Sequence, residues 1–305
     1  MIDSASGIRF LERNEIDIIK WDRCIENAAN GLIYARSFYL DIMAKNWSAL
    51  IQGDYNVIMP LPWNRKYFIS YLYQPAFTAQ LGLFAHDDAN DNLIEKFLAI
   101  AENKFRFCEI HLNYHDKITR LPFRSNYVLQ LDKVYTEIRK GYKKRLLVNL
   151  KEAESHNLHY SSSENFLSVV FLYEQEYGSR FNHIKTKQFD QFKQLCNEMR
   201  RREMLFVREV KDSYGNLLSS SIFFIDRRRI YNIMSVTLKP GREKRSHFYL
   251  IDQLIREYSS RNILLDFEGS ELPGVAEFYK KFGPRYEPYP YLKFNHLPLP
   301  IRLFK

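Results

Sequence analysis

The stretch MLFVREVKDSYGNLLSSSIFFIDRRRIYNIMSVTL, residues 204–238, decides the fold class of this chain. Three runs rich in β-branched and aromatic residues, Met204–Lys211, Leu217–Asp226 and Ile230–Leu238, are separated by short polar segments. The first separator, Ser213-Tyr214-Gly215-Asn216, has the composition of a tight turn. The pattern therefore predicts three antiparallel strands joined as a meander.

Helical and strand signals alternate after this meander. Ser246 is expected to cap a helix whose apolar residues recur at helical spacing. A short apolar strand over Ile263–Phe267 follows, and then a helix over Pro273–Phe282, which Gly283 and Pro284 end. Tyr289–Phe294 is expected to form a last strand.

The first half of the chain shows the same order of elements. Helical patterns near residues 14–28 and 37–45 precede three β-rich runs, a helix beginning at Asp91 and a buried strand, Phe107–Leu112; the β-rich runs are Ser48–Gln52, Tyr55–Leu61 and Tyr67–Tyr73, with a separator at Trp63–Lys66. Met204 follows Ser48 by 156 residues, and Ile263 follows Phe107 by 156. A chance alignment of common elements is the alternative to a duplicated α+β unit.

We predict two tandem α+β domains, residues 1–133 and 134–305, each with a mixed, mostly antiparallel sheet flanked by helices. The length of 305 residues suits two domains, and 46% hydrophobic residues exclude a disordered chain. The second domain is expected to begin with a basic helix, Val134–Glu154, followed by helices near Ser163–Tyr177 and Lys187–Arg202.

Positive charge is concentrated in the second half of the chain. Residues 1–135 carry 15 Lys and Arg against 16 Asp and Glu, whereas residues 136–305 carry 30 against 20. This asymmetry suggests an anionic ligand such as a phosphate, a nucleic acid or a lipid head group, although a solvated basic surface explains it equally well. The arginine runs 200–202 and 227–229 are expected to be solvated surface runs; the alternative is that both face one groove and bind a tRNA backbone.

Localisation follows from what the sequence lacks. No apolar run approaches the roughly 18 residues of a membrane span, so any membrane contact is expected to be peripheral. We find no signal peptide, and Cys24, Cys108 and Cys196 lie far apart, which suits reduced thiols in a cytoplasmic protein. His111 and His115 lie on a strand-to-loop segment without a completing carboxylate pattern, so we expect no metal.

Three segments carry a resemblance to a known family. Residues 143–153, KKRLLVNLKEA, form a basic helix, residues 264–270 read LLDFEGS, and residues 278–283 read FYKKFG. Together with the two meanders, they resemble the FemAB-like transferases, which carry two copies of the Gcn5-related N-acetyltransferase (GNAT) fold. In the first half, Gln74-Pro75 and Gln80-Leu81-Gly82 match a weaker pattern of that family.

The resemblance implies transfer of an acyl or aminoacyl group to an amine acceptor. It suggests a nucleotide-linked or lipid-linked cell-wall precursor as acceptor, a role in peptidoglycan synthesis, and aminoacyl-tRNA as donor, without a firmly implied cofactor. The first half would shape the acceptor side, and the second half would hold the donor. Two alternatives stay open, an acyl-CoA-dependent N-acyltransferase and a non-catalytic binding protein that kept the fold.

Two departures from the family pattern bear on these alternatives. In the loop before the helix at Ser246, Arg245 and His247 stand where acetyl-CoA users of this fold have small residues, so their side chains would crowd a pyrophosphate. Tyr279 stands at the family's lysine. Lys280 follows directly, but consecutive helical residues point about 100° apart, so it does not simply replace that lysine.

The candidate site residues follow from the needs of acyl transfer. A carboxylate beside the acyl group can accept the amine proton, and strand alternation places Asp266 and Glu268 on one face. The alternative for Asp266 is a structural salt bridge. We expect Asp266, Glu268, Tyr279 and Lys280 to be catalytic, and the following residues to bind substrate or donor: Lys144, Arg145, Asn149, Arg180, Arg242, Arg245 and Ser246. Arg145 and Asn149 are four residues apart on the predicted basic helix.

Overall fold

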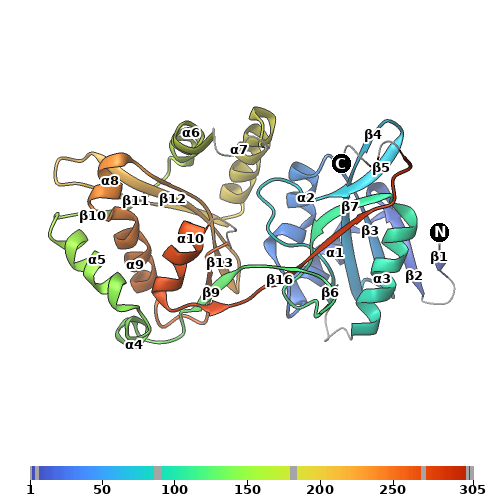
Figure 1. The fold of residues 1–305 in the computed structure, drawn as a ribbon, viewed down its shortest axis with the longest axis horizontal. Coiled ribbons are helices and arrows are strands. Elements are labelled where there is room, and N and C mark those ends of the chain that lie inside the picture. The colour runs from blue at the N-terminus through green and yellow to red at the C-terminus, as the bar shows by residue number, and fades with distance from the viewer. Residues whose placement is uncertain are drawn as a thin grey trace. The chain divides into compact units, whose positions relative to one another are not determined.

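The computed structural model describes residues 2–3, 7–85, 91–178, 184–268, 273–299 and 302. The chain divides into two compact units, shown in Figure 1. Unit 1 comprises Met1–Arg124 and Pro288–Lys305, and unit 2 comprises Ser125–Glu287. Unit 2 is therefore one continuous segment, whereas unit 1 is built from two.

Unit 1 is an antiparallel meander extended by a parallel strand and covered by helices. Its described strands follow the order β1-β2-β3-β4-β5-β7-β16-β8, and β6 pairs with β4. The strands are β1 (Ile2–Asp3), β2 (Ile8–Glu12), β3 (Asn46–Gln52), β4 (Val57–Lys66), β5 (Ile69–Tyr73), β6 (Phe84–Ala85), β7 (Phe107–His111), β8 (Phe123–Arg124) and β16 (Tyr289–Asn295). The helices are α1 (Ile18–Asn27), α2 (Ser37–Met43) and α3 (Asp91–Lys104), and Phe97 and Leu98 of α3 pack in the core with Leu50 and Leu61 of the sheet.

Unit 2 repeats this arrangement. Its sheet has the order β10-β11-β12-β13-β14-β9-β15. These strands are β9 (Tyr127–Gln130), β10 (His159–Ser163), β11 (Leu205–Lys211), β12 (Leu217–Ile225), β13 (Arg229–Thr237), β14 (Leu264–Asp266) and β15 (Arg285–Tyr286). The helices are α4 (Tyr135–Lys140), α5 (Lys144–Glu154), α6 (Phe166–Tyr177), α7 (Thr186–Arg201), α8 (Lys239–Glu243), α9 (Ser246–Tyr258) and α10 (Pro273–Tyr279), which continues as the 3₁₀ turn η4 (Lys280–Phe282).

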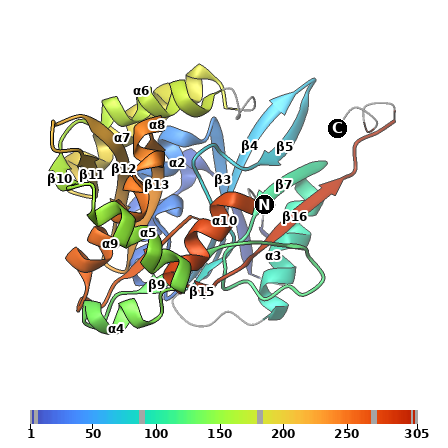
Figure 2. The same cartoon turned by 60° about the vertical axis from the view of Figure 1, so that its left-hand side comes forward.

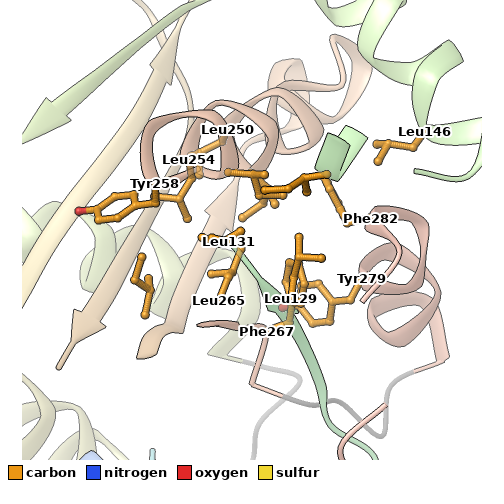
Figure 3. Packing of buried hydrophobic residues seen from close by; sticks show 14 of the residues in the cluster. Leu129, Leu131, Leu146, Leu250, Leu254, Tyr258, Leu265, Phe267, Tyr279 and Phe282 are labelled. Carbon is orange, nitrogen blue, oxygen red and sulfur yellow. The ribbon is translucent and has the colours of Figure 1, made fainter. Parts of the chain in front are cut away.

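Short-range sequence signals explain the meander and core of unit 2. The Asp212 Oδ1 atom accepts hydrogen bonds from the backbone of Tyr214 and of Asn216, which closes the β11–β12 turn. Leu250 and Leu254, on one face of α9, are buried together with Leu265 and Phe267 of the sheet, as Figure 3 shows. Burial of such side chains stabilises a fold by about 1.5–3 kcal/mol each, so this face holds α9 on the sheet.

The predicted duplication of an α+β unit is confirmed. In unit 1 the strands β5 and β7 are parallel neighbours, and in unit 2 the same relation joins β13 and β14. Each of these pairs follows a three-stranded antiparallel meander. The mixed, mostly antiparallel sheets flanked by helices match the predicted fold class.

The two units exchange their next strand. The predicted last strand exists as β16, but it pairs antiparallel with β7 of unit 1, from Tyr291↔His111 to Asn295↔Phe107. In turn, β9 comes from the chain just after the first sheet and pairs antiparallel with β14 of unit 2. Each sheet is thus completed by a strand that is distant in sequence from the meander it extends.

Several boundaries differ from the prediction. The expected basic helix Val134–Glu154 is two helices, α4 and α5, since the chain turns between Gly141 and Lys143. Ser246 does not cap α9 but is its first residue, and Arg245 is the N-cap in the left-handed conformation with φ of 56°. The expected separator Trp63–Lys66 belongs to β4. Its residues pair with β5 from Trp63↔Leu72 to Lys66↔Ile69, so the turn lies at residues 67–68. Gly283 ends the last helix, as predicted, with φ of 71°.

Candidate functional site

The candidate site of unit 2 lies where two parallel strands separate. β13 and β14 pair through Arg229↔Leu264, Ile230↔Leu265 and Tyr231↔Asp266. β14 ends at Asp266, whereas β13 continues to Thr237. The backbone of β13 beyond Tyr231 therefore has no described strand on its β14 side, which leaves polar groups at this edge for a ligand.

A β-bulge shapes β13 at this point. Ile222 pairs with Met234 and Phe223 pairs with Asn232, so Ile233 is an extra residue. Bulges redirect side chains and are frequent beside active sites. Asn232 is 4% exposed; its Oδ1 accepts a hydrogen bond from Ser235 Oγ at 2.8 Å, and its Nδ2 lies 3.5 Å from the hydroxyl of Tyr279.

Tyr279 faces this edge from the last turn of α10. Its ring stacks on Phe267 with centroids 4.9 Å apart, and Figure 3 shows the two side chains together. Burial, with further contributions from Glu268 and Tyr173, raises the pKa of Tyr279 well above its usual value. The phenol therefore stays protonated near neutral pH and can donate a hydrogen bond.

Glu268 is the titratable group that the structure leaves unsatisfied here. It lies two residues after the end of β14 and has φ of 58°, an uncommon conformation for a residue with a side chain. Its Oε1 atom is buried, and no described residue forms a hydrogen bond with it. Burial raises the pKa of Glu268 to about 8. A carboxyl group with such a pKa is half ionised just above neutral pH, where general bases work best.

Asp266 is held differently from Glu268. Its Oδ2 atom lies 2.6 Å from Arg229 Nη1, and its Oδ1 atom accepts a hydrogen bond from the backbone of Glu268 at 2.9 Å. Arg229 Nη1 also lies 2.7 Å from Glu287 Oε2, and Arg229 is 3% exposed. Arg229 is thus buried, and its predicted place in a solvated arginine run was wrong, because two buried carboxylates neutralise it. Asp266 anchors the backbone that presents Glu268.

The side chain of Lys280 has different neighbours from that of Tyr279, the residue before it. Its Nζ atom is 2.8 Å from Glu277 Oε1, one turn back on α10. It lines an open groove of about 470 Å³ together with Tyr127, Lys143, Gly283, Pro284 and Tyr286. Lys280 and Lys143 give this groove positive charge that suits an anionic ligand.

The predicted binding residues of α5 do not share one face. Lys144 and Arg145 are exposed, but Asn149 is 9% exposed and packs inside unit 2. Arg145 raises the local positive potential near Lys281, whose pKa is lowered first by burial and then by Arg145. Arg180 lies outside the described residues.

The cations of the loop before α9 have carboxylate partners. Arg242 pairs with Glu176, Lys244 with Asp212, and Arg245 with Glu152, each at 3.2 Å. Ser246 is fully buried, and its Oγ atom would lie 2.6 Å from a Cβ added to Gly241. The pairs of Arg242 and Arg245 are solvent-exposed and worth about 0–1 kcal/mol each, so they are weak competitors for an anionic ligand.

Sequence reasoning missed Asn232 and Arg229. Nothing in the local sequence marks Asn232, because its place depends on the bulge at Ile233. Within the described ranges, no cluster of His, Cys, Asp and Glu is suited to hold a metal ion. None of the described helices is long and apolar enough to cross a membrane.

No protein-family model matches the chain, and no curated protein matches it in sequence. Solved structures do. One, described as FemX, is 12% identical with a TM-score of 0.62, covering 94% of this chain and 98% of that one. The C-terminal domain of a putative lysylphosphatidylglycerol synthetase from Agrobacterium fabrum is 10% identical with a TM-score of 0.54, covering 94% of each chain.

A third similar structure is a tandem GNAT protein from the clavulanic acid biosynthesis pathway. It is 10% identical with a TM-score of 0.53, and the match covers 95% of this chain and 99% of that one. All three matches extend over nearly the whole chain. At these identities the likeness concerns the fold, and it agrees with the paired order of strands in the two units. The chain therefore shares the fold of these three structures, one of which is a tandem GNAT protein.

Proposed function

We propose that this protein transfers an acyl or aminoacyl group to an amine acceptor, with the reaction site in unit 2. The observation that carries the proposal is the Glu268 carboxyl group near Tyr279, at the edge where β13 and β14 separate; its pKa is raised, and its buried Oε1 atom has no hydrogen-bond partner among the described residues. Perturbed groups of this kind concentrate at functional sites. The tandem GNAT fold supports the same class of reaction by analogy.

The residues suggest how the transfer would proceed. Ionised Glu268 would accept a proton from the acceptor amine while the amine nitrogen forms a bond to the acyl carbon. The bond from the acyl carbon to the donor oxygen or sulfur breaks as the tetrahedral species collapses. The neutral phenol of Tyr279 would donate a hydrogen bond to the leaving oxygen or sulfur as it develops negative charge, and the proton taken up by Glu268 would then pass to that leaving atom.

Asp266 and Arg229 would act as positioning residues in this scheme. Asp266 binds the backbone of Glu268, and Arg229 neutralises Asp266. Such support holds the carboxyl group of Glu268 in a fixed position, and proton transfer depends on that geometry. Lys280 and Lys143, which line the open groove, would contribute to binding an anionic donor rather than to proton transfer.

We favour aminoacyl-tRNA as donor over acyl-CoA. In the loop before α9, Arg245 and His247 stand where acetyl-CoA users of this fold have small residues, and their side chains would crowd a pyrophosphate. A cationic groove suits a phosphate backbone, and binding should then weaken with salt. For the acceptor we propose a nucleotide-linked or lipid-linked cell-wall precursor in the cytoplasm, on the basis of the family resemblance.

The test measures amide formation with different acyl donors, and in the wild type against a Glu268 variant. Wild-type protein is incubated with radiolabelled aminoacyl-tRNA, or with acetyl-CoA and palmitoyl-CoA, and with a panel of amines that includes a nucleotide-linked peptide precursor. We expect amide formation from aminoacyl-tRNA and a loss of about 100-fold or more in Glu268→Gln. Glu203→Gln is the matched control, because Glu203 is an exposed glutamate of the same unit with the same φ of 58° as Glu268.

Other results would replace the proposal. Tight binding and turnover of an acyl-CoA would make the protein an acyl-CoA-dependent N-acyltransferase. Binding of a donor without turnover, unchanged in Glu268→Gln, would make it a binding protein that kept the fold.

A further inference from the structure

The hairpin of β4 and β5 extends beyond the rest of the sheet of unit 1. β4 pairs with β3 as far as Trp63↔Asn46, and β5 pairs with β7 at Leu72 and Tyr73. Past these points, the described residues Asn64–Lys66 and Ile69–Tyr71 pair with one another across the hairpin. Figure 2 shows this two-stranded ribbon, in light blue, projecting from unit 1.

The turn of this hairpin has a backbone conformation that its two residues, Tyr67 and Phe68, rarely adopt. Tyr67 and Phe68 form a two-residue turn with φ of 49° and 65°. Two positive φ values are typical of a type I′ turn, which favours Asn-Gly because a bulky side chain is strained there. Tyr67 is 74% exposed and Phe68 is 89% exposed, so neither ring gains stability from packing in the core. The fold alone gives no reason for these two aromatic residues.

Positive charge accompanies the exposed rings. Arg65 and Lys66 precede the turn and are exposed, with the Arg65 guanidinium 5.8 Å from the ring of Phe68 and Lys66 Nζ 5.3 Å from that of Tyr67. Residues 57–73 contain no Asp or Glu. We call residues Arg65–Phe68 the aromatic tip. Below it, Tyr71 packs on Tyr73 and Phe107, with centroids 6.2 Å apart in both cases, which braces the ribbon.

We propose that the aromatic tip docks unit 1 on an anionic lipid surface. The rings of Tyr67 and Phe68 would enter the boundary between head groups and acyl chains, where aromatic side chains are favoured. Arg65 and Lys66 would contact lipid phosphates, and each basic residue near such a surface strengthens binding about fivefold. This inference does not depend on the proposed reaction, since it concerns another unit and other residues.

The shape of the tip favours a bilayer over other partners. Two side chains on a narrow, convex ribbon offer far less area than the roughly 800 Å² per partner of a stable protein interface. A single-stranded nucleic acid binds along a basic groove with stacking platforms, which a protruding turn does not provide. A deformable lipid interface, by contrast, accommodates a convex aromatic tip that carries cations.

The test uses flotation of the full chain with vesicles of phosphatidylcholine and phosphatidylglycerol at 3:1, and with phosphatidylcholine alone. We expect binding to the anionic vesicles that weakens with salt. The double variant Tyr67→Asn/Phe68→Gly installs the favoured turn sequence, so its melting temperature should equal or exceed that of the wild type. We expect it to bind anionic vesicles at least tenfold more weakly. Arg65→Gln/Lys66→Gln should lose the preference for phosphatidylglycerol.

Tyr214→Ser is the matched control. Tyr214 is 88% exposed in the turn between β11 and β12, so its replacement also removes an exposed aromatic residue from a hairpin. It should leave vesicle binding unchanged. The proposal is overturned if the wild type fails to float, or if the Asn-Gly variant floats as well as the wild type. Loss of single-stranded RNA binding or of self-association in that variant, with flotation intact, would assign the tip to those partners instead.

Discussion

Burial of a carboxyl oxygen without a hydrogen-bond partner favours the protonated acid, and among the described residues the Oε1 atom of Glu268 has no such partner. Its pKa of about 8 in the folded protein exceeds the usual value of 4.5. Between these values the folded protein holds one more proton than the unfolded chain, so stability falls as pH rises. Below pH 4.5 Glu268 is protonated in both the folded and the unfolded state, so its burial carries no cost of ionisation and the protein has its full stability.

This linkage gives a prediction at the scale of one residue. The melting temperature of the wild type should decline between pH 5 and 8 more steeply than that of Glu268→Gln, which cannot ionise. Turnover should rise over the same range, since the base must be ionised. Melting curves and rates at pH 5–9 check both effects. Parallel melting curves for the two proteins would contradict the assignment of this pKa.

Asp266 should behave as a structural residue when tested alone. Asp266→Asn leaves buried Arg229 with one carboxylate, Glu287, and releases the backbone of Glu268. We expect a loss of about 3 kcal/mol in the free energy of unfolding by urea, because a broken buried ion pair is costly. Glu268→Gln should lose turnover without this loss of stability. Equal stability of Asp266→Asn and the wild type would remove the positioning role from Asp266.

At the scale of elements, the end of α10 and η4 depends on a close backbone contact. Gly283 has φ of 71°, and a Cβ at this position would lie 2.3 Å from the carbonyl oxygen of Gly141. Both the conformation and the contact exclude a side chain. Gly283→Ala should therefore lower the free energy of unfolding by about 2 kcal/mol or more.

Gly274 supplies the control for that change. It lies in α10 with no heavy atom within 4 Å of an added Cβ. Gly274→Ala should be neutral or slightly stabilising, since alanine favours helix. Urea unfolding of both variants measures the difference, and similar stabilities would show that the contact between Gly283 and Gly141 can relax.

Local elements were predictable because their signals lie within a few residues. The turn at Asp212–Asn216 and the helix end at Gly283 depend on near neighbours. The turn at Tyr67 and Phe68 has no Gly or Asn, so the sequence placed it wrongly at Trp63–Lys66. Burial of Arg229 depends on Asp266 and on Glu287, which are distant in sequence, and a local pattern of three arginines therefore suggested solvent.

At the scale of the whole molecule, the partner of each exchanged strand could not be predicted. The alternation of residues in Tyr289–Asn295 indicates a strand but not the sheet that it joins. Pairing of β16 with β7 joins residues that are distant in sequence, so it depends on packing rather than on the β-propensity of the strand. The division into residues 1–133 and 134–305 describes the duplicated sequence pattern and stays a prediction. The compact units have other bounds, because β9 is part of unit 2 and β16 is part of unit 1.

Fragments should reveal this exchange. A fragment of residues 125–287 contains every described strand of the second sheet, so it should unfold cooperatively in urea. A fragment of residues 1–133 lacks β16 and exposes the edge of β7, so it should aggregate or stay partly folded. Circular dichroism and gel filtration compare the two. A cooperative, monomeric 1–133 would show that β16 is dispensable.

The exchange also sets an order of events during synthesis on the ribosome. Domains commonly fold in the order in which they emerge, with the N-terminal one first. Here β16 is made after all of unit 2, so the sheet of unit 1 waits for a strand that the ribosome has yet to produce. The unit that emerges second can close first, and the half-built sheet beside it is the part of the nascent chain that most needs a chaperone.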